Sequence, residues 1–545
     1  MDMYRAFLAI ILSFLILVGY QYFFMPGQVP IVPVQEQTQP QSAAELADPV
    51  PSSVVASKTV AVDLNARNIV INTPLYKAIF FEQGGGLKSF TLKKYRTEKS
   101  DEAPPMEMVT TDNPGDLPMI FSLDNGTGAE MPLFHASQEN LSLETGSIGE
   151  LLMVAELANG IKLERKLSFT ADSYLIDSKY TVSNTGSTVL SIHPAMAMTN
   201  TPFPTGPANS SAFNGPAVYI NGKMEQIKTK KLKDGPLSFQ GIIGWAAHTD
   251  NYFMCALIPE KSNNALVTVT HLGEETMRTV LTDGIVTLTP GESKVFQYEG
   301  YFGPKKLAYL KQTGYDLAEA INFGWFDILA KPMLRLLNFF YQVFGNYGIA
   351  IILLTCLIKG SFWPITQKGM KSMKNMQKLQ PKVAKLREKY KDDPVKMNQE
   401  MMTMYKTYKV NPVGGCLPMV IQIPFFFALY RVLMAAIELR HAPFMLWIND
   451  LSAPDRLMIG FDIPILHGIP VLTILMGGSM FLQQKMTPTT ADPTQAKVMQ
   501  FLPIIFTVMF INFASGLVLY WFVNNLLSIL QQQLINKQTS KNTSN

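Results

Sequence analysis

A single charge, Lys359, lies inside the long apolar run Tyr347–Trp363. A run of this length can cross much of a bilayer, where an ammonium group costs about 2.5–3.5 kcal/mol on insertion scales. Ionisable residues at that depth generally belong to a functional site, and we predict this role for Lys359. The alternative is a side chain that extends to the membrane surface, since Lys368 follows only a few residues later.

Other apolar runs bring the predicted number of membrane-spanning helices to six. These runs are Ala6–Phe24, Leu417–Ile437, Ile463–Leu482, Val498–Phe513 and Ser515–Leu534. A span normally takes about 20 residues, so the fifth span, and the apolar part of the fourth that follows His467, are short. We interpret the first run as an uncleaved anchor over residues 1–25, because Met25-Pro26-Gly27 follows it where a signal peptide would have its cleavage site.

The charges of the loops predict their side of the membrane. Residues 367–411 carry twelve Lys and Arg against four acidic residues, whereas residues 438–467 carry two against four. By the positive-inside rule the first loop is cytoplasmic, and both termini then lie in the cytoplasm. Residues 26–344 are therefore predicted to be exported.

The exported part begins with a predicted linker over residues 26–59, where Pro, Gln, Ser and Ala predominate. From residue 60 to residue 320 the sequence changes to short runs of alternating polarity. One such run places Ile176, Ser178 and Tyr180 on one strand face and ends at Asn184. About 260 residues of this pattern predict a large antiparallel β-sandwich domain.

No catalytic or metal-binding motif stands out in this domain. Its histidines (His135, His193, His248 and His271) are scattered, and the sequence lacks a Gly-rich phosphate loop and the HExxH and GxSxG motifs. The three cysteines have no zinc-ligand spacing. We therefore predict no cofactor, no metal and no enzymatic activity, and binding of a peptide or a sugar in a cleft stays open. The net charge of +4 is too small to indicate a DNA partner.

Two segments that flank the Lys359 run are predicted to be amphipathic. Residues 321–345 read as a helix in the membrane interface, with a seventh span as the weaker alternative because charges and Pro332 interrupt it. Residues 367–411 read as a cytoplasmic hairpin of two helices, joined near Pro394, with methionines at helical spacing. These methionines either bury themselves within the hairpin or offer an adaptable surface to apolar client segments.

Sparse polar residues mark the predicted spans. Thr355 lies one turn before Lys359 on the same helix face, Gln422 lies in the third span, and Asn524 and Asn525 lie in the sixth. Such residues often only join helices, at about 0.6 kcal/mol each. With Lys359 among them, a polar cavity open to one side is the prediction. Arg431 is expected to extend outward, away from Lys359.

Four motifs resemble one family over residues 340–536. They are NPVGGCLPMVIQIPFFFALY (Asn411–Tyr430), ELRHAPFMLWINDLSAPD (Glu438–Asp455), QKMTPTTADP (Gln484–Pro493) and SGLVLYWFVNN (Ser515–Asn525). The chain resembles the YidC, Oxa and Albino family of membrane protein insertases. An anchor with a large exported β-domain resembles its Gram-negative form, in which that domain is a β-supersandwich similar to galactose mutarotases.

The resemblance implies a multi-pass protein of the bacterial inner membrane, with a five-helix insertase core over residues 346–536 and a short cytoplasmic tail over 537–545. It implies a hydrophilic groove, open to cytoplasm and lipid but closed to the outside, that inserts and helps to fold membrane proteins, alone or with the Sec translocon. We assign to this groove Lys359, Thr355, Gln422, Pro424, Tyr520, Trp521 and Asn524. We assign to a client- and ribosome-contacting loop Met370, Met373, Met376, Lys378, Lys382 and Lys385. Nascent membrane proteins, lipids, the Sec translocon and, weakly, the ribosome are the implied partners.

Two positions depart from the family pattern. Lys359 stands where arginine is usual, which keeps the charge but not the rigid fork of donors. Trp521 stands where a second tyrosine often follows Tyr520, so the hydroxyl is lost. Two other functions compete with insertion: a small-molecule transporter, and an exported carbohydrate-binding or mutarotase-like enzyme on a membrane scaffold. Inverted repeats would favour the transporter, and none is visible.

Overall fold

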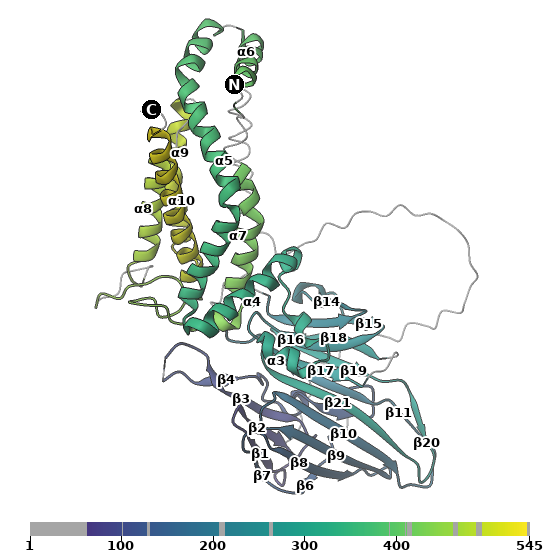
Figure 1. The fold of residues 1–545 in the computed structure, drawn as a ribbon. Helices are drawn as coiled ribbons and strands as arrows, with labels where there is room; N and C mark the ends of the chain where they lie inside the picture. Colours follow the sequence, from purple (N-terminus) through teal and green to yellow (C-terminus); the bar gives the residue numbers. More distant parts are fainter. Residues whose placement is uncertain are drawn as a thin grey trace, which may run out of the picture. The chain divides into compact units, whose positions relative to one another are not determined.

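The computed structural model describes residues 63–541 except 101, 128–130, 206–212, 261–264, 392, 409, 411–416, 461–466 and 487–492. The predicted anchor over residues 1–25 and the predicted linker over 26–59 lie outside the described residues. The chain divides into two compact units, one up to Ile321 and one from Asn322. The first unit consists mainly of strands and the second of helices (Figure 1).

The described strands of the first unit form four sheets, of which the largest has nine strands. Its order is β14(Lys223–Gln226), β13(Gly215–Ile220), β16(Ile243–Thr249), β17(Phe253–Pro259), β21(Ser293–Pro304), β10(Leu175–Asn184), β9(Ile161–Thr170), β8(Ile148–Glu156), β6(His135–Ala136). One five-stranded sheet has the order β4(Pro105–Glu107), β3(Leu87–Arg96), β2(Tyr76–Phe81), β1(Asn68–Asn72), β7(Asn140–Ser142). A second has the order β15(Leu237–Gln240), β18(Leu266–Gly273), β19(Thr276–Thr282), β12(Ala195–Asn200), β5(Ile120–Ser122), and β11(Leu190–Ile192) pairs with β20(Val286–Leu288).

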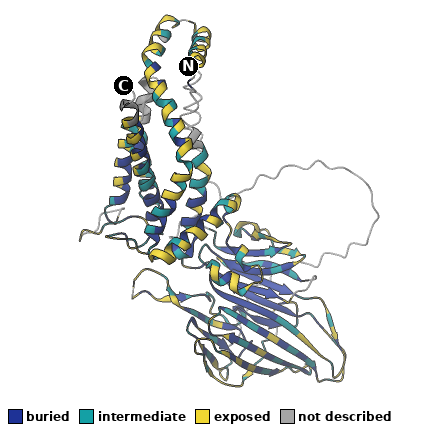
Figure 2. Ribbon diagram, in the orientation of Figure 1, coloured by how far each residue is buried: buried dark blue, intermediate teal, exposed yellow. Residues whose placement is uncertain are grey.

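Both five-stranded sheets pack on one face of the nine-stranded sheet. Phe169 on β9 lies beside Ile176 on β10, and Tyr180 shares that face because side chains alternate along a strand. The ring of Phe169 contacts Phe80 of the first five-stranded sheet at 6.0 Å between centroids, and the ring of Tyr180 stacks on Phe121 of the second at 4.1 Å. The core of this unit is therefore a layer of aromatic and aliphatic side chains between the sheets (Figure 2).

Short helices complete the first unit. They are η1(Pro114–Asp116), α2(Thr229–Leu232), α3(Leu307–Thr313) and η2(Leu317–Ala320). Trp245 on β16 is fully buried, and its indole N–H donates to the carbonyl oxygen of Asp316 at 3.4 Å. This contact ties the segment after α3 to the nine-stranded sheet.

The second unit contains η3(Gly324–Phe326), α4(Asp327–Phe344), α5(Tyr347–Lys389), α6(Pro394–Thr407), α7(Leu417–Ala435), η5(Ile437–Leu439), α8(Val471–Met486), α9(Pro493–Phe510) and α10(Ser515–Lys541). Helix α10 packs against both α5 and α8, α4 packs against α5 and α7, and α8 packs against α9. The long connection from α7 to α8 lies at the end of the unit where α5, α8 and α10 begin.

Helix α5 differs from the prediction that a span ends near Trp363 and a separate hairpin helix follows. It continues without a break from Tyr347 to Lys389, and it includes Pro364 and Pro381. A proline within a helix removes one backbone hydrogen bond. Where packing holds the turns on either side, the proline bends the helix but does not end it. Buried Thr366 provides such packing, because its hydroxyl hydrogen-bonds with Gln531 on α10 at 3.1 Å.

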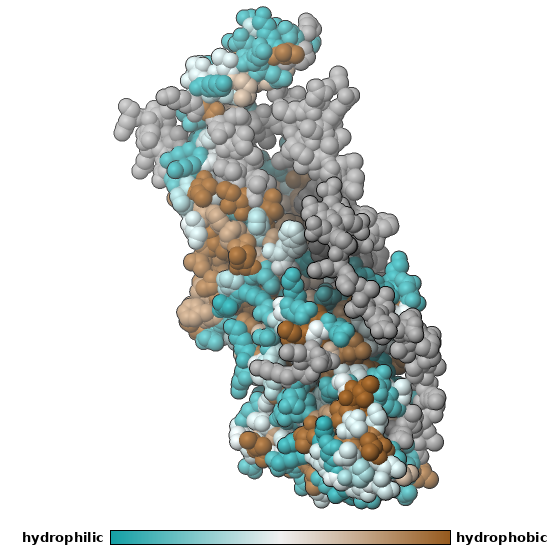
Figure 3. Space-filling view, turned by 90° about the vertical axis from the view of Figure 1, so that its right-hand side faces the viewer, coloured by the Kyte–Doolittle hydropathy of each residue, from teal (hydrophilic) through white to brown (hydrophobic). Residues whose placement is uncertain are grey.

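By length and composition, one helix of the described residues, over Tyr347–Leu386, can cross a membrane. Two shorter apolar helices cover Ile421–Ala435 and Gln500–Phe510. Hydrophobic side chains gather along the middle of the helical unit in the space-filling view (Figure 3). The number of six spans remains a prediction.

Helices α8 and α9 approach closely at Gly477. A Cβ atom at this position would lie 2.0 Å from the Thr507 hydroxyl and 3.1 Å from its Cβ, whereas a Cβ atom at Gly478 would meet nothing within 4 Å. We expect Gly477→Ala to destabilise the unit by about 1–3 kcal/mol, because the helices must move apart. Gly478→Ala should instead be neutral or stabilising by up to about 1 kcal/mol, because alanine is the better helix former.

Thermal unfolding of the two detergent-solubilised variants checks this prediction. Equal melting temperatures for Gly477→Ala and Gly478→Ala would show that the two helices tolerate a methyl group between them.

Candidate functional site

Lys359 lies on α5 and is buried, with 5 % of its surface exposed. Its ammonium Nζ donates to the Ser528 hydroxyl of α10 at 2.7 Å, and that hydroxyl donates to the carbonyl oxygen of Asn524 at 2.8 Å. None of the ion pairs among the described residues includes Lys359. An ammonium has three donors, so the interaction with Ser528 leaves two N–H groups for another acceptor.

Helix α10 carries polar contacts on both of its flanks. Toward α5, Lys359 meets Ser528, Thr366 meets Gln531, and Lys374 donates to Asn536 at 3.1 Å. Toward α8, Asn525 donates to Ser479 at 3.0 Å, and Gln532 donates to the carbonyl oxygen of Met486 at 2.5 Å. Asn525 thus joins two helices, which is the role that isolated polar residues in spans most often have.

Thr355 lies one turn before Lys359 on α5, and Asn524 of α10 lies behind the Ser528 hydroxyl that Lys359 contacts. Thr355 is 1 % exposed, and its hydroxyl donates to the carbonyl oxygen of Ile351 on its own helix. Asn524 is half-buried and supplies the carbonyl oxygen behind Ser528. The Ser528 hydroxyl thus holds the cation without neutralising its charge.

The aromatic residues of the predicted groove belong to a cluster formed by α7, α9 and α10. The Trp521 ring lies 4.8 Å from the Phe426 ring and 5.1 Å from the Phe510 ring. Tyr520 is buried and lies 6.3 Å from Phe426. These rings form an apolar wall where α7 and α9 meet α10.

Two predicted groove residues on α7 are placed differently from each other. Gln422 is half-buried and lies one turn before Phe426, on the face that meets α10. The Pro424 side chain is exposed. Arg431 is exposed as well, and its direction toward the exported side stays a prediction.

The predicted loop residues divide between the inside and the outside of the α5–α6 hairpin. Met376 is buried in a cluster with Leu379 and Val410, against which Tyr405 packs. Met370 and Met373 are half-buried, and Lys378, Lys382 and Lys385 are exposed. Lys382 lies over the Tyr408 ring, 4.4 Å from its centroid. The buried Met376 has the self-packing role, while the lysines form an open cationic face.

Sequence reasoning missed Ser528, the hydrogen-bonding partner of Lys359. It lies one turn after Asn524, so extending the helical spacing by one turn would have found it. Reasoning from the sequence also missed Asp455, which is buried in the α7–α8 loop and for which the sequence gives no periodic signal.

Two family models together cover most of the chain. A model described as the 60Kd inner membrane protein matches residues 339–542, and a model described as the YidC periplasmic domain matches residues 68–336. A membrane protein insertase YidC of Syntrophobacter fumaroxidans is 40% identical to this chain over 98% of the chain and 99% of the relative. The chain belongs to the YidC family of membrane protein insertases. The family resemblance found in the sequence motifs is thereby confirmed, and the helical unit with Lys359 falls within the inner-membrane model.

Solved structures are also similar to this chain. A crystal structure of an active YidC insertase with its first transmembrane domain resolved is 20% identical, covers 88% of this chain and 94% of its own, and has a TM-score of 0.36. A galactose mutarotase-like protein from Lactobacillus casei is 14% identical, covers 43% of this chain and 99% of its own, and has a TM-score of 0.31.

Proposed function

We propose that this chain inserts proteins into the bacterial inner membrane along a hydrophilic groove beside Lys359. Membership of the YidC family makes the chain a membrane protein insertase and not an enzyme in the catalytic sense. The observation that carries the proposed groove is the buried ammonium of Lys359, whose hydrogen-bonding partner is a neutral hydroxyl. Two of its donors remain for the acidic flank of an incoming protein.

Insertion by this route needs no nucleotide. A client's apolar segment gains about 25 cal/mol for each Å² that leaves water, which amounts to many kcal/mol for a whole span. The costly step is the transfer of the short polar flank, whose charges lose their hydration. A buried cation lowers this cost because it replaces part of the water around a carboxylate.

The proposed groove has a polar side and an apolar side. Lys359, Thr355 and the Asn524–Ser528 turn form the polar side, and we place Gln422 beside it. The aromatic cluster around Trp521 and Tyr520 supports a path for the client's apolar segment. Exposed Ile474, Phe481 and Phe501 on α8 and α9 support contact of these helices with lipid.

Helix α4 supports a position in the membrane interface. Its buried side chains Ala330, Met333, Leu334 and Leu337 face the other helices, whereas Ile328 is 82 % exposed and Phe339 56 %. Asp327 and Lys331 pair at 3.4 Å near its start. A helix with one buried apolar face, and an exposed face that combines apolar side chains with Arg335, suits the boundary between headgroups and acyl chains.

We further propose the topology that the charges of the loops predict. Six spans place residues 26–344 in the periplasm and the α5–α6 hairpin in the cytoplasm. The exposed Lys378, Lys382 and Lys385 then face anionic lipid headgroups or ribosomal RNA. Cooperation with the Sec translocon belongs to the same proposal.

Reconstitution of the purified chain into liposomes tests the proposed autonomous insertion. The client is a single-span protein with a short acidic translocated tail, and protease protection of that tail is measured. We expect protection well above that in empty liposomes. Protection that requires added Sec translocon would contradict autonomous insertion but would keep a Sec-dependent role.

A further inference from the structure

One segment of the first unit, residues 223–233, carries a concentrated positive charge. It contains five lysines and one acidic residue, Glu225, so its net charge of +4 equals that of the whole chain. We call it the lysine segment. It begins with β14, continues through α2 and contains Lys223, Lys228, Lys230, Lys231 and Lys233. A concentration of one sign of charge attracts a partner of the opposite sign.

Four lysines of the segment have exposed side chains that pair with nothing in the described part of the chain. No ion pair or side-chain hydrogen bond joins them to another described residue, and they are Lys223, Lys230, Lys231 and Lys233. Lysines on β9 of the same unit differ, because Lys162 pairs with Glu164 at 2.7 Å and Lys166 pairs with Glu150 at 2.8 Å. The lysine segment therefore presents its charge to the surroundings of the unit.

The fold holds the lysine segment in place along its length. β14 pairs with β13, where Lys223 lies opposite Ile220, and the backbone N–H of Ile227 donates to the carbonyl oxygen of Pro216 at 2.9 Å. Helix α2 then packs on β18 and buries Leu232. Because Leu232 points into the unit, the exposed lysines on either side of it point away from the unit.

An exposed apolar side chain adjoins the lysine segment. Ile242, in the turn between β15 and β16, is 63 % exposed. Its backbone N–H donates to the side-chain oxygen of Asn221 at 3.1 Å, and its carbonyl oxygen accepts from the backbone N–H of Asn221 at 2.9 Å. Asn221 lies two residues before Lys223, in the turn that precedes β14. Lysines beside an exposed aliphatic side chain suit the surface of an anionic bilayer.

The lysine segment belongs to the part of the first unit from which the chain continues to α4. Helix η2 packs against β14, and the unit ends at Ile321. Helix α4, for which we propose a position in the membrane interface, begins at Asp327. A bilayer is therefore only a few residues away along the chain.

Protection of a sheet edge accounts for only part of this charge. β14 is the last strand of the nine-stranded sheet (Figure 1), and lysines on such a strand prevent pairing with other chains. This role explains Lys223. It does not explain the three exposed lysines that follow the strand, on α2 and directly after it, which are Lys230, Lys231 and Lys233.

We propose that the lysine segment and Ile242 dock the first unit on the anionic phospholipids of the bilayer. This inference goes beyond insertion itself and rests on the proposed position of α4. The ammonium groups contact lipid phosphates, and the Ile242 side chain enters the headgroup region. Attraction at a charged surface falls off within a Debye length, about 10 Å at 0.1 M salt, so docking requires anionic lipid and weakens at high salt.

Quenching of a fluorescent probe by spin-labelled lipid tests the docking. The full chain is reconstituted in nanodiscs of phosphatidylcholine that carries a doxyl group near its headgroup, with or without phosphatidylglycerol. Cys356 and Cys416 are replaced by serine, Cys255 stays because it is buried, and Ile242→Cys carries the probe. We expect quenching about threefold stronger with phosphatidylglycerol than without it, and loss of this difference at about 1 M salt.

Reversal of three charges in the lysine segment should abolish the effect of phosphatidylglycerol, because the segment then repels anionic lipid. The reversed variant combines Lys230→Glu, Lys231→Glu and Lys233→Glu. A control variant changes the net charge equally at exposed lysines outside the segment, through Lys77→Glu, Lys99→Glu and Lys179→Glu. The control variant should be quenched like the unaltered chain.

Two outcomes would overturn the docking. One is a probe at position 242 that is quenched no more with phosphatidylglycerol than without it, which would leave an acidic protein as the partner of the lysine segment. The other is a reversed variant that is quenched as strongly as the control variant. A probe at Ile328→Cys on α4, where the side chain is 82 % exposed, reports separately on that helix. Absence of quenching there would contradict the interface position of α4, so the two failures are distinguishable.

Discussion

Replacing Lys359 by methionine should reduce the insertion of a client with an acidic tail by about tenfold or more. Two unit charges 4 Å apart interact by about 4 kcal/mol at an effective dielectric constant of 20, and a third of that is a factor of ten. Methionine has a similar length and removes only the charge and its hydrogen bond to Ser528. The rate of tail protection in liposomes measures the effect.

Changing the charge at position 359 separates electrostatic attraction of the client from packing of the side chain. Lys359→Arg should insert the acidic client within about threefold of the unaltered chain, because the charge remains. Lys359→Glu should fail with an acidic tail and recover with a basic one. Equal insertion of the acidic client by the Met, Arg and Glu variants would mean that Lys359 does not recruit clients through its charge.

Acidification from pH 7 to about 4.5 should destabilise the β unit, and His248 should account for about 2.5 kcal/mol of the loss. His248 on β16 is 2 % exposed, its Nε2 has no hydrogen-bond partner among the described residues, and its ring contacts Phe203 at 5.2 Å. Burial lowers the pKa of His248 from 6.5 to about 3. The folded state therefore keeps the ring neutral while the unfolded state takes up a proton.

Because the pKa of His248 is lower in the folded state than in the unfolded state, acid lowers the free energy of unfolding. Above pH 6.5 both states are neutral at this residue and stability is unaffected. Between pH 6.5 and about 3 the unfolded state binds the additional proton, so each pH unit costs about 1.4 kcal/mol. Buried carboxylates such as Asp250, whose pKa is raised by burial, act in the opposite direction, so only the difference between variants isolates His248.

Hydrogen exchange of the β16 and β17 amides in the solubilised full chain, corrected for intrinsic exchange rates, measures this stability. His248→Gln should lose less protection on acidification than the unaltered chain. His135→Gln, at an exposed position on β6, is the control and should behave like the unaltered chain. A His248→Gln variant with the same acid sensitivity as the unaltered chain would refute the prediction.

The strands were the most predictable part of the fold, because a half-buried strand repeats every two residues. Ile176, Ser178 and Tyr180 indeed lie on the buried face of β10, which ends at Asn184 as the turn residues indicate. The packing of two smaller sheets on one face of the largest was not predictable, because pairings between distant strands leave no local pattern.

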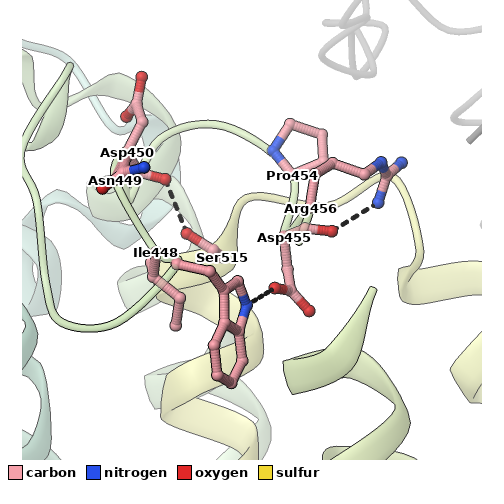
Figure 4. A pocket seen from close by; sticks show the side chains of 8 residues that line it. Ile448, Asn449, Asp450, Pro454, Asp455, Arg456 and Ser515 are labelled. Atoms are coloured by element: carbon pink, nitrogen blue, oxygen red, sulfur yellow. Dashed lines mark hydrogen bonds between the residues drawn. The ribbon is translucent and has the colours of Figure 1, made fainter. Parts of the chain in front are cut away.

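The helical site was predictable in its residues and less so in its contacts. Thr355 and Lys359 share a buried face, as their spacing indicates. The continuity of α5 past Trp363 depends on contacts such as that between Thr366 and Gln531, which join helices far apart in the sequence. The contacts of buried Asp455 with Trp447 and Thr473 likewise form only when the chain folds (Figure 4).

The continuity of α5 has a mechanical consequence. Pro364 cannot donate a hydrogen bond to Gly360, the residue after Lys359, and a Cβ atom at Gly360 would meet nothing within 4 Å. The helix therefore lacks one backbone hydrogen bond directly after Lys359, at a glycine whose own side is open. A bend of 5° there moves Lys389 by about 4 Å, since thirty residues of helix span about 45 Å. The two ends of α5 are therefore geometrically coupled: any bend beside Lys359 displaces the α5–α6 hairpin by several times the displacement at the bend itself.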